Sequence, residues 1–282
     1  GVKGNLSVVD GGTADGLNLR QLIENDGAGL LGKANYERFG LEFPLLIKFI
    51  DARQDLSIQV HPDDKLAMER HGSKGKTEMW YVVNATPTAH LKSGLNTALT
   101  PETYVQAVEN NTICDKLEDY NVKAGDVFFL PAGRIHSIGA GCFIAEIQQT
   151  SDITYRIYDF NRLDANGNPR QLHTELAKDA IDYTVSANYR TDYTMPREGM
   201  VTLVDCPYFN VGMAAVGNDA LKLPETDSFF ILMAIENDIE IKADGCTDVL
   251  RKGHTALISA DTESTAIKAL ANEAKVLIAY IG

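Results

Sequence analysis

The stretch between residues 56 and 83 restricts the fold and chemistry of this chain more than any other part of the sequence. It opens with strict alternation, so Ser57, Gln59 and His61 fall on one face of an expected strand and apolar residues on the other. Pro62 then ends the strand, because it has no amide hydrogen to donate to a neighbouring strand. The pattern predicts a short strand with one polar face.

A short helix and a second strand are expected next. Asp63 can cap a helix, and Gly72 is a residue type at which helices commonly end. Glu78 follows and opens an apolar run at 79–83. A strand–helix–strand unit can turn the Gln and His of the first strand and this Glu toward one point. Their oxygen and neutral nitrogen atoms are ligands for a divalent metal, so the stretch predicts a metal site.

A second motif, G-D-V-F-F-L-P-A-G-R-I-H at residues 125–136, supplies one more ligand. Its apolar run at 127–130 predicts a buried strand, and residues 131–133 predict a tight turn. His136 lies just beyond that turn. A histidine held on a turn between two strands is well placed to point into the mouth of a barrel, so we expect His136 to join the site.

Composition excludes several classes of partner. The chain has 282 residues and a formal net charge of -13, which argues against nucleic acid and anionic membranes but leaves room for a small phosphorylated ligand held by local Lys and Arg. The longest apolar run, at 43–50, is far too short to span a bilayer, and no signal peptide is visible. The four cysteines are widely spaced, so we expect reduced thiols in a soluble, cytoplasmic protein.

The chain divides at a polar, irregular stretch between residues 186 and 200. We expect residues 1–190 to form the metal-binding catalytic domain, with helices near 17–25 and 100–110, a short helical segment at its end, and its opening strands missing from the chain. Residues 191–282 are expected to form a β-domain without a metal site. Short strands between turn residues are typical of a sandwich or barrel, and the candidates lie at 208–213, 229–235, 239–242, 255–259, 265–269 and 275–281.

A weak internal repeat supports this division. Residues 253–261 align with residues 125–133 without a gap, and the same offset places Ser264 where the first copy has His136. The second domain is therefore expected to share the fold of the first and to lack the metal histidine.

Several motifs together resemble a known family. The spacing G-x5-P-x-G-x2-H is similar to the second motif of the cupin superfamily, although Ala140 stands where that motif usually ends in Asn. The first motif has Gln59 and His61 where many cupins have H-x-H. L-S-I-Q-V-H-P-D-D, K-T-E-M-W-Y-V-V, P-A-G-R-I-H and T-Y-R-I-Y-D-F resemble type I mannose-6-phosphate isomerase (phosphomannose isomerase) in its short bacterial form.

The resemblance implies a mainly β fold of two cupin-like jelly-roll β-barrels with a few short helices. It implies one Zn²⁺ per chain and the interconversion of mannose 6-phosphate and fructose 6-phosphate through a cis-enediol. The implied metal ligands are Gln59, His61, Glu78 and His136. The implied catalytic residues are Arg156 and Lys76, and the implied substrate-binding residues are Ser57 and Lys65.

The chemistry leaves the general base open. Arg156 stays cationic at any working pH, so we assign it to stabilising an enediolate or the phosphate. Lys76 beside a metal is expected to have a lowered pKa, which makes it one candidate base; Glu78 and a metal-bound hydroxide are others. His173, at a helix start, is expected to be a surface or packed residue.

Two alternatives remain at this point. One is a different enzyme in the same cupin frame, such as an iron-dependent dioxygenase, although Gln in place of His argues against redox iron. The other is a non-catalytic sugar-binding cupin, against which the positive pair of Lys76 and Arg156 argues. We expect the protein to be a monomer or a weak homo-oligomer.

Overall fold

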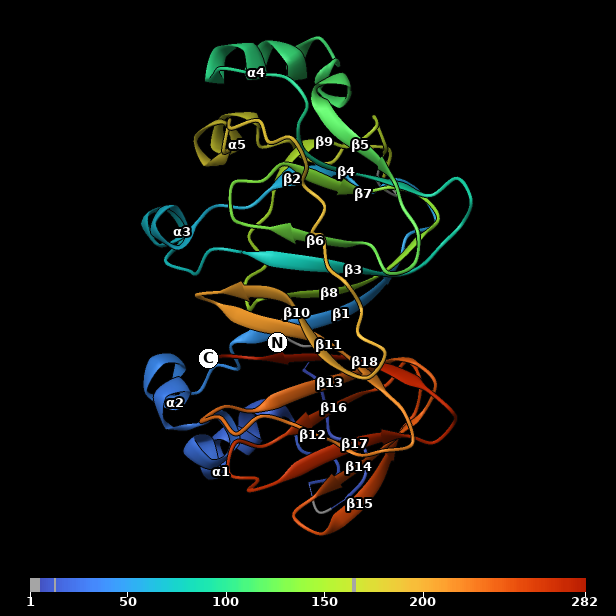
Figure 1. The fold of residues 1–282 in the computed structure, drawn as a ribbon. Coiled ribbons are helices and arrows are strands. Elements are labelled where there is room, and N and C mark those ends of the chain that lie inside the picture. Colours follow the sequence, from blue (N-terminus) through green and yellow to red (C-terminus); the bar gives the residue numbers. More distant parts are fainter. Residues whose placement is uncertain (1–5, 13, 164–165) are drawn as a thin grey trace. The chain divides into compact units, whose positions relative to one another are not determined.

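The computed structural model describes residues 6–12, 14–163 and 166–282. The fold is mainly β, as expected, and the chain separates into two compact units (Figure 1). Residues 45–191 form what we call the first β unit, and the residues up to 44 together with 192–282 form the second β unit. No helix in the described part of the chain is long and apolar enough to cross a membrane.

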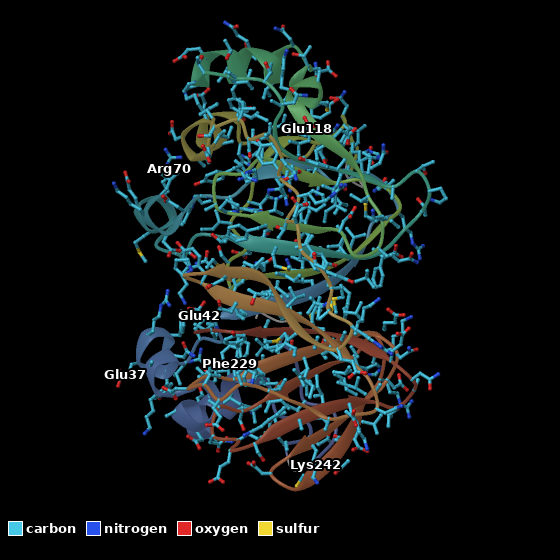
Figure 2. All side chains as sticks on the ribbon, viewed as in Figure 1. Glu37, Glu42, Arg70, Glu118, Phe229 and Lys242 are labelled. Atoms are coloured by element: carbon cyan, nitrogen blue, oxygen red, sulfur yellow. The ribbon has the colours of Figure 1, made fainter. Side chains whose placement is uncertain are left out.

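The first β unit consists of two antiparallel sheets. One sheet has the order β1 (Leu45–Asp51), β8 (Cys142–Gln149), β3 (Glu78–Ala85) and β6 (Val127–Leu130). The other has the order β5 (Leu117–Asn121), β4 (His90–Leu95), β7 (His136–Ile138), β2 (Ile58–Val60) and β9 (Tyr155–Tyr158). Alternate residues point inward from each sheet, and a buried cluster that includes Trp80 of β3 and Leu91 of β4 joins the two faces. Figure 2 shows side chains filling the space between the strand ribbons.

Three α-helices lie in this unit, each where the sequence predicts one. The helix α3 (Asp64–His71) begins at Asp63, whose side chain accepts a hydrogen bond from the Leu66 amide, and ends at Gly72 in the left-handed conformation. The helices α4 (Pro101–Glu109) and α5 (Thr174–Ala180) pack through Tyr104 and Ala177 onto the outer side of the second sheet, with a short 3-10 turn (Ile113–Lys116) after α4 (Figure 1).

The second β unit also consists of two antiparallel sheets. One has the order β10 (Gly199–Cys206), β11 (Phe209–Val216), β18 (Ala274–Tyr280), β13 (Phe230–Glu236) and β16 (Thr255–Ile258). The other has the order β12 (Leu221–Lys222), β17 (Thr265–Ala269), β14 (Ile239–Ala243) and β15 (Cys246–Leu250). An entirely apolar cluster lies between them, drawn from β13 and β18 on one side and β14 and β17 on the other.

The N-terminal helices α1 (Leu19–Leu31) and α2 (Lys33–Phe39) belong to the second β unit. The carboxylate of Asp227 accepts the backbone N–H groups of Lys33 and Ala34 at the start of α2, and Phe43 contacts Phe229 with ring centroids 4.9 Å apart. The expected roles of the two domains, one catalytic and metal-binding and the other without a metal site, stay predictions. The compact units differ from it in one respect, because residues up to 44 group with the C-terminal strands rather than with the expected first domain.

The internal repeat has a structural counterpart. The strand β16 begins and ends at the same offset of 128 residues from β6 that the sequence alignment gives, and both are the outer strands of their sheets. Glu78 pairs with Leu130 across β3 and β6, and Phe230 pairs with Ile258 across β13 and β16. Phe230 therefore occupies in the second β unit the place that Glu78 occupies in the first.

Candidate active site

Three of the expected ligands meet inside the first β unit. His61 follows β2, Glu78 opens β3, and His136 opens β7, and all three side chains are buried. The Nε2 atom of His61 lies 3.6 Å from Oε2 of Glu78, and the Nε2 atom of His136 lies 3.2 Å from Oε1. Among the described residues these three form the one cluster of His, Cys, Asp and Glu side chains suited to a metal ion, with ligand atoms within 4.8 Å of one another.

The hydrogen bonds around the cluster indicate that a cation can bind there. The Nδ1 atom of His61 lies 2.8 Å from the carbonyl oxygen of Ile153, and that of His136 lies 2.8 Å from the carbonyl oxygen of Arg134. If each Nδ1–H donates to its carbonyl, each neutral imidazole directs the lone pair of Nε2 at the carboxylate. Nε2 of His61 and both oxygens of Glu78 make no well-formed hydrogen bond among the described residues, and Oε2 of Glu78 has the ammonium of Lys76 as an ion-pair partner at 3.0 Å. Converging lone pairs in a buried site are unfavourable without a positive charge between them, so these residues fit a divalent metal.

Burial and neighbouring charges set the ionisation of the cluster. Burial lowers the pKa of His61 well below its ordinary value, with Lys76 acting in the same direction, and this keeps the imidazole neutral. Burial alone would raise the pKa of Glu78, but the Lys76 ammonium is the largest opposing cause, and the pKa lies well below its usual range. A neutral His and an ionised Glu are the forms that ligate a metal.

Gln59 lies beside the cluster, but its amide nitrogen rather than its amide oxygen faces His136. It pairs directly with His136 across β2 and β7, and its Nε2 atom lies 3.2 Å from Nε2 of His136. In this orientation the amide nitrogen donates to the imidazole lone pair. Rotation of the amide by half a turn brings its oxygen to the same place, so Gln59 can provide the fourth ligand atom that the sequence predicts.

Lys76 contacts the cluster but differs from expectation in its pKa. Its Nζ atom lies 3.0 Å from Oε2 of Glu78, and its side chain is almost fully buried. Burial alone would lower the pKa of Lys76, but the carboxylates of Glu78 and Glu146 outweigh it and raise the pKa. The expected lowering depended on a neighbouring metal charge; among the protein groups alone Lys76 is a firmly protonated donor.

A second buried polar network lies against the cluster and was not expected from the sequence. Gln148 is the cross-strand partner of Glu78, and its neighbour on the same face, Glu146, accepts hydrogen bonds from Trp80 Nε1 at 2.9 Å and from Lys48 Nζ at 2.8 Å. Lys48 also donates to Gln148 Oε1 at 2.6 Å. These hydrogen bonds join β1, β3 and β8 next to Glu78 and so help to hold Glu78 in position.

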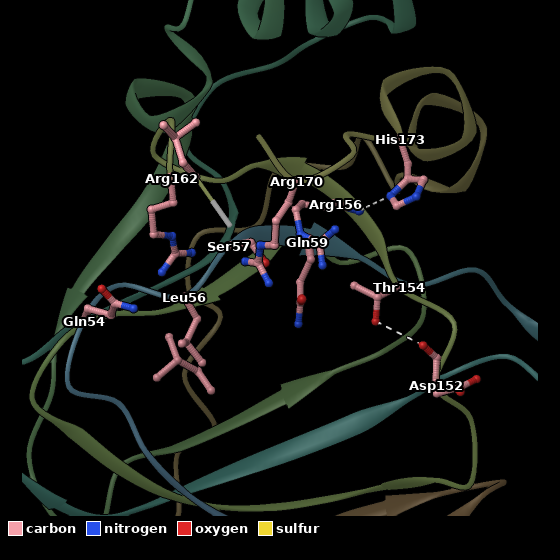
Figure 3. Close-up of a pocket in the computed structure, with 12 residues that line it drawn as sticks. Gln54, Leu56, Ser57, Gln59, Asp152, Thr154, Arg156, Arg162, Arg170 and His173 are labelled. Carbon is pink, nitrogen blue, oxygen red and sulfur yellow. Dashed lines mark hydrogen bonds between the residues drawn. The ribbon is translucent and has the colours of Figure 1, made fainter. Parts of the chain in front are cut away.

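Gln59, which contacts His136 of the cluster, lines an open pocket of about 680 Å³ (Figure 3). The rest of its wall comes from the loop before β2, from β7, from the segment between β8 and β9, from β9 and from the chain after β9. Three arginines line this pocket, namely Arg156, Arg162 and Arg170. Burial and the proximity of the other two arginines lower the pKa of Arg156, which shows how closely the positive charges gather.

The structure separates the two expected substrate-binding residues. Ser57 is buried and lines the same pocket as Gln59 and Arg156. Lys65, on the exposed side of α3, lines a different depression of about 440 Å³ together with Glu69 and Asp179. Within the described residues, therefore, Arg156 and Ser57 share the pocket, Lys76 reaches the metal cluster, and Lys65 does neither.

Several residues of the pocket were missed by reasoning from the sequence. Arg162 and Arg170 line the pocket on either side of the isolated bridge between Leu163 and Pro169. His173 also lines the pocket, where its Nδ1 atom accepts the backbone N–H of Arg156 at 3.0 Å. The available signal was the density of basic residues on both sides of the sequence D-A-N-G-N-P, which is unusual in an acidic chain.

Fold and site together define a class. The protein has two β units, and within the described residues of the first a buried cluster suited to a divalent metal lies beside Gln59, which lines an arginine-rich pocket. Residues 6–104 match the family model described as "Phosphomannose isomerase type I, catalytic domain". The chain is 37% identical over 235 residues to mannose-6-phosphate isomerase ManA of Bacillus subtilis, covering 82% of this chain and 72% of that protein. It is 36% identical over 254 residues to a mannose-6-phosphate isomerase of Streptococcus mutans, covering 88% and 77%.

A solved structure agrees with these relatives. The crystal structure of the mannose 6-phosphate isomerase from Bacillus subtilis superposes with a TM-score of 0.86 at 32% identity, covering 98% of this chain and 86% of the other. The chain belongs to the type I mannose-6-phosphate isomerase (phosphomannose isomerase) family, which is a family of aldose–ketose isomerases.

Proposed function

We propose that this chain interconverts mannose 6-phosphate and fructose 6-phosphate, with a zinc ion held by Gln59, His61, Glu78 and His136. The observation that carries the proposal is that Gln59, which contacts His136 of the metal-type cluster, lines the same pocket as Arg156. Family membership supports the choice of reaction, since the relatives named above are mannose-6-phosphate isomerases.

The reaction moves a proton between C1 and C2 through a cis-enediol, so it needs a base, a group that stabilises negative charge on oxygen, and a hold on the phosphate. Zinc, when bound, supplies Lewis-acid polarisation of the sugar oxygens. Arg156 has a pKa lowered by burial and by neighbouring arginines, yet it stays a cation and faces the pocket. It is suited to stabilising the enediolate as charge develops.

Lys76 is the second cation that the chain offers. Because its pKa is raised by Glu78 and Glu146, it serves the proposed reaction as a hydrogen-bond donor to a sugar oxygen rather than as the resting base. Ser57 lines the pocket and can donate a hydrogen bond to the sugar ester. These assignments leave the general base among the remaining groups of the pocket.

The proposal is tested by a coupled assay for fructose 6-phosphate formed from mannose 6-phosphate. The protein is assayed as prepared, after treatment with a chelator, and after zinc is added back. We expect turnover that the chelator abolishes and zinc restores. A folded, zinc-loaded protein without turnover would contradict the proposal and favour a non-catalytic sugar-binding role.

A further inference from the structure

A buried charged group that the proposed reaction does not yet use lies behind two arginines of the pocket. Asp159 directly follows β9, and its carboxylate is almost fully buried. Arg170 contacts it twice, with Nε donating to Oδ2 at 2.7 Å and Nη2 donating to Oδ1 at 2.5 Å. Arg162 donates to the same Oδ1 atom through Nη2. One buried carboxylate therefore holds two guanidinium groups.

Both arginines are positioned by more than this carboxylate. Arg162 also donates from Nη1 to the carbonyl oxygen of Asp55 at 2.7 Å and from Nε to the carbonyl oxygen of Asp159 at 3.2 Å. Arg170 remains partly exposed, with 43% of its side chain accessible. Its two-point contact uses two of the five N–H groups of a guanidinium, so the outer edge of Arg170 keeps donors for another acceptor.

The charges around the pocket favour a dianion. Three guanidinium groups line it and Asp152 is the one carboxylate among its described lining residues (Figure 3). Two arginines on one carboxylate leave an excess positive charge at this end of the pocket. The hydrogen bonds from Arg170 and Arg162 also lower the pKa of Asp159 against the effect of its burial, so the carboxylate stays ionised.

We propose that Asp159 is a positioning residue that holds Arg170, with Arg162, as the anion-selecting edge of the pocket, and that Arg170 contacts the phosphate of the sugar ester. This rests on the proposed function for the identity of the sugar. Fixing the guanidinium before the ligand arrives removes an entropy cost from binding, and a planar donor edge matches phosphate oxygens. Arg170, rather than Lys65, then distinguishes a phosphorylated sugar from the free sugar.

The test uses the zinc-loaded full chain and two readouts. The first is the KM and kcat for mannose 6-phosphate, and the second is the Kd for inorganic phosphate measured by calorimetry. Arg170→Gln is expected to raise both KM and the phosphate Kd by about ten- to a hundredfold, since a charge-assisted contact is lost, with kcat changed much less. Arg20→Gln, an exposed residue of the second β unit, is the control for the same change in net charge and is expected to alter neither.

Asp159→Asn distinguishes a role of Asp159 in holding Arg170 in place from a simple effect of its negative charge on phosphate binding. It removes a negative charge, so a purely coulombic site would bind phosphate more tightly, whereas loss of the clamp weakens binding. We expect weaker binding, with zinc content unchanged. Tighter phosphate binding by Asp159→Asn, full recovery of affinity by Arg170→Lys, or an unchanged KM and phosphate Kd in Arg170→Gln would each overturn the proposal.

The two proposals fail in different ways. If the wild-type protein does not convert mannose 6-phosphate, the proposed reaction is wrong, and the calorimetric arm still tests the anion site. Should Asp159→Asn fail to fold, as judged by its thermal unfolding, the comparison of Arg170→Gln, Arg170→Lys and Arg20→Gln decides the matter without it.

Discussion

At the scale of single residues, the buried carboxylate of Glu78 has the strictest requirements. It is fully buried, it has no hydrogen-bond partner among the described residues, and it lies between two imidazole lone pairs and one ammonium. An ionised carboxylate in such a place is stable only when cations balance it. Each ligand around it is therefore expected to matter for metal content before it matters for the fold.

His136→Ala removes one ligand atom from this cluster. We expect zinc affinity to fall by more than about a hundredfold, since even outer-shell changes cost ten- to a hundredfold, and activity to fall with it. Metal analysis and the coupled assay measure the two effects. His254→Ala, at an exposed position of the second β unit, is the control. Unchanged zinc content and rate in His136→Ala would remove His136 from the ligand set.

Arg156→Ala tests the proposed stabilisation of the enediolate. The Nε atom of Arg156 is buried without a hydrogen-bond partner among the described residues, while Nη1 donates to the carbonyl oxygen of Gln171 at 3.1 Å. We expect kcat to fall by about a hundred- to a thousandfold, as when one stabilising donor is lost, with zinc retained and a smaller rise in KM. A variant altered in KM alone would instead make Arg156 a phosphate anchor.

At the scale of elements, the turn between α3 and β3 determines where Lys76 points. Gly75 N donates to Asp64 Oδ1 at 2.8 Å, and Lys76 N donates to the carbonyl oxygen of Pro62 at 3.1 Å. A methyl group on Gly75 would lie 2.5 Å from the backbone of Asp63 and Asp64, which is closer than real contacts allow. The two segments approach closely because Gly75 has no side chain.

Gly75→Ala is therefore expected to displace Lys76 from Glu78. We expect a loss of about 1–3 kcal/mol in stability, as for other overpacked sites, and a fall in kcat. Asp63→Ala is the matched comparison, because it removes only the N-terminal cap of α3 and is expected to cost about 1 kcal/mol with kcat retained. Denaturant unfolding and the coupled assay measure both variants. Equal losses of kcat in the two would contradict this account of Gly75.

The junction between β9 and α5 is expected to respond to pH. His173 accepts the Arg156 N–H on Nδ1 and donates its own backbone N–H to the Arg156 carbonyl oxygen at 2.7 Å, with the Tyr155 ring also nearby. Burial and the Arg156 charge lower the pKa of His173 below its ordinary value of 6.5. The unfolded chain therefore takes up the proton first as pH falls.

The resulting stability is fully present above pH 6.5 and decreases as pH falls from there toward the lowered pKa of the folded protein. His173→Asn keeps an acceptor near the Nδ1 position but does not titrate. We expect this variant to lose less stability than the wild type between pH 6.5 and the lowered pKa, as measured by denaturant unfolding at a series of pH values. Parallel pH profiles for the two proteins would show that His173 does not carry the effect.

At the scale of the whole molecule, the two β units are expected to differ in how far their stability depends on a bound metal. A metal that binds only the folded state stabilises the part of the chain that holds it. We expect chelation to increase hydrogen exchange in β2, β3 and β7 and to leave β13, β14 and β18 unchanged. Hydrogen exchange followed by mass spectrometry measures this. Equal increases in both sets of strands would show that the metal stabilises the chain globally.

Local sequence signals predicted a large part of this organisation. The alternation before Pro62, the cap at Asp63 and the histidine after the 131–133 turn all act within a few residues, and the structure has the corresponding elements. Signals of this kind were weaker in two other places. The strand β15 is mostly exposed and lacks an apolar pattern, and α1 continues through a kink at Asp26, past residue 25 where the expected helix ends.

The arginine clamp could not be predicted from local signals. Asp159 and Arg170 meet only because the chain folds back after β9, and no short-range pattern reports which carboxylate an arginine will find. Lys65 illustrates the reverse case, since its position in the motif suggested the pocket while the structure places it in another depression with Glu69 and Asp179; its role in substrate binding stays a prediction. Side-chain direction across a turn is a tertiary property, whereas caps and strand alternation are local ones.

The equivalence of Glu78 and Phe230 has a consequence for how this protein can be supplied with metal. The second β unit builds the same strand order around an apolar residue, so the architecture itself does not depend on an ion. We therefore expect the metal-free protein to keep its strand order, so that an ion can be loaded after synthesis and a lost ion can be replaced without making a new chain. Metal availability would then change the number of active molecules while the number of molecules stays the same.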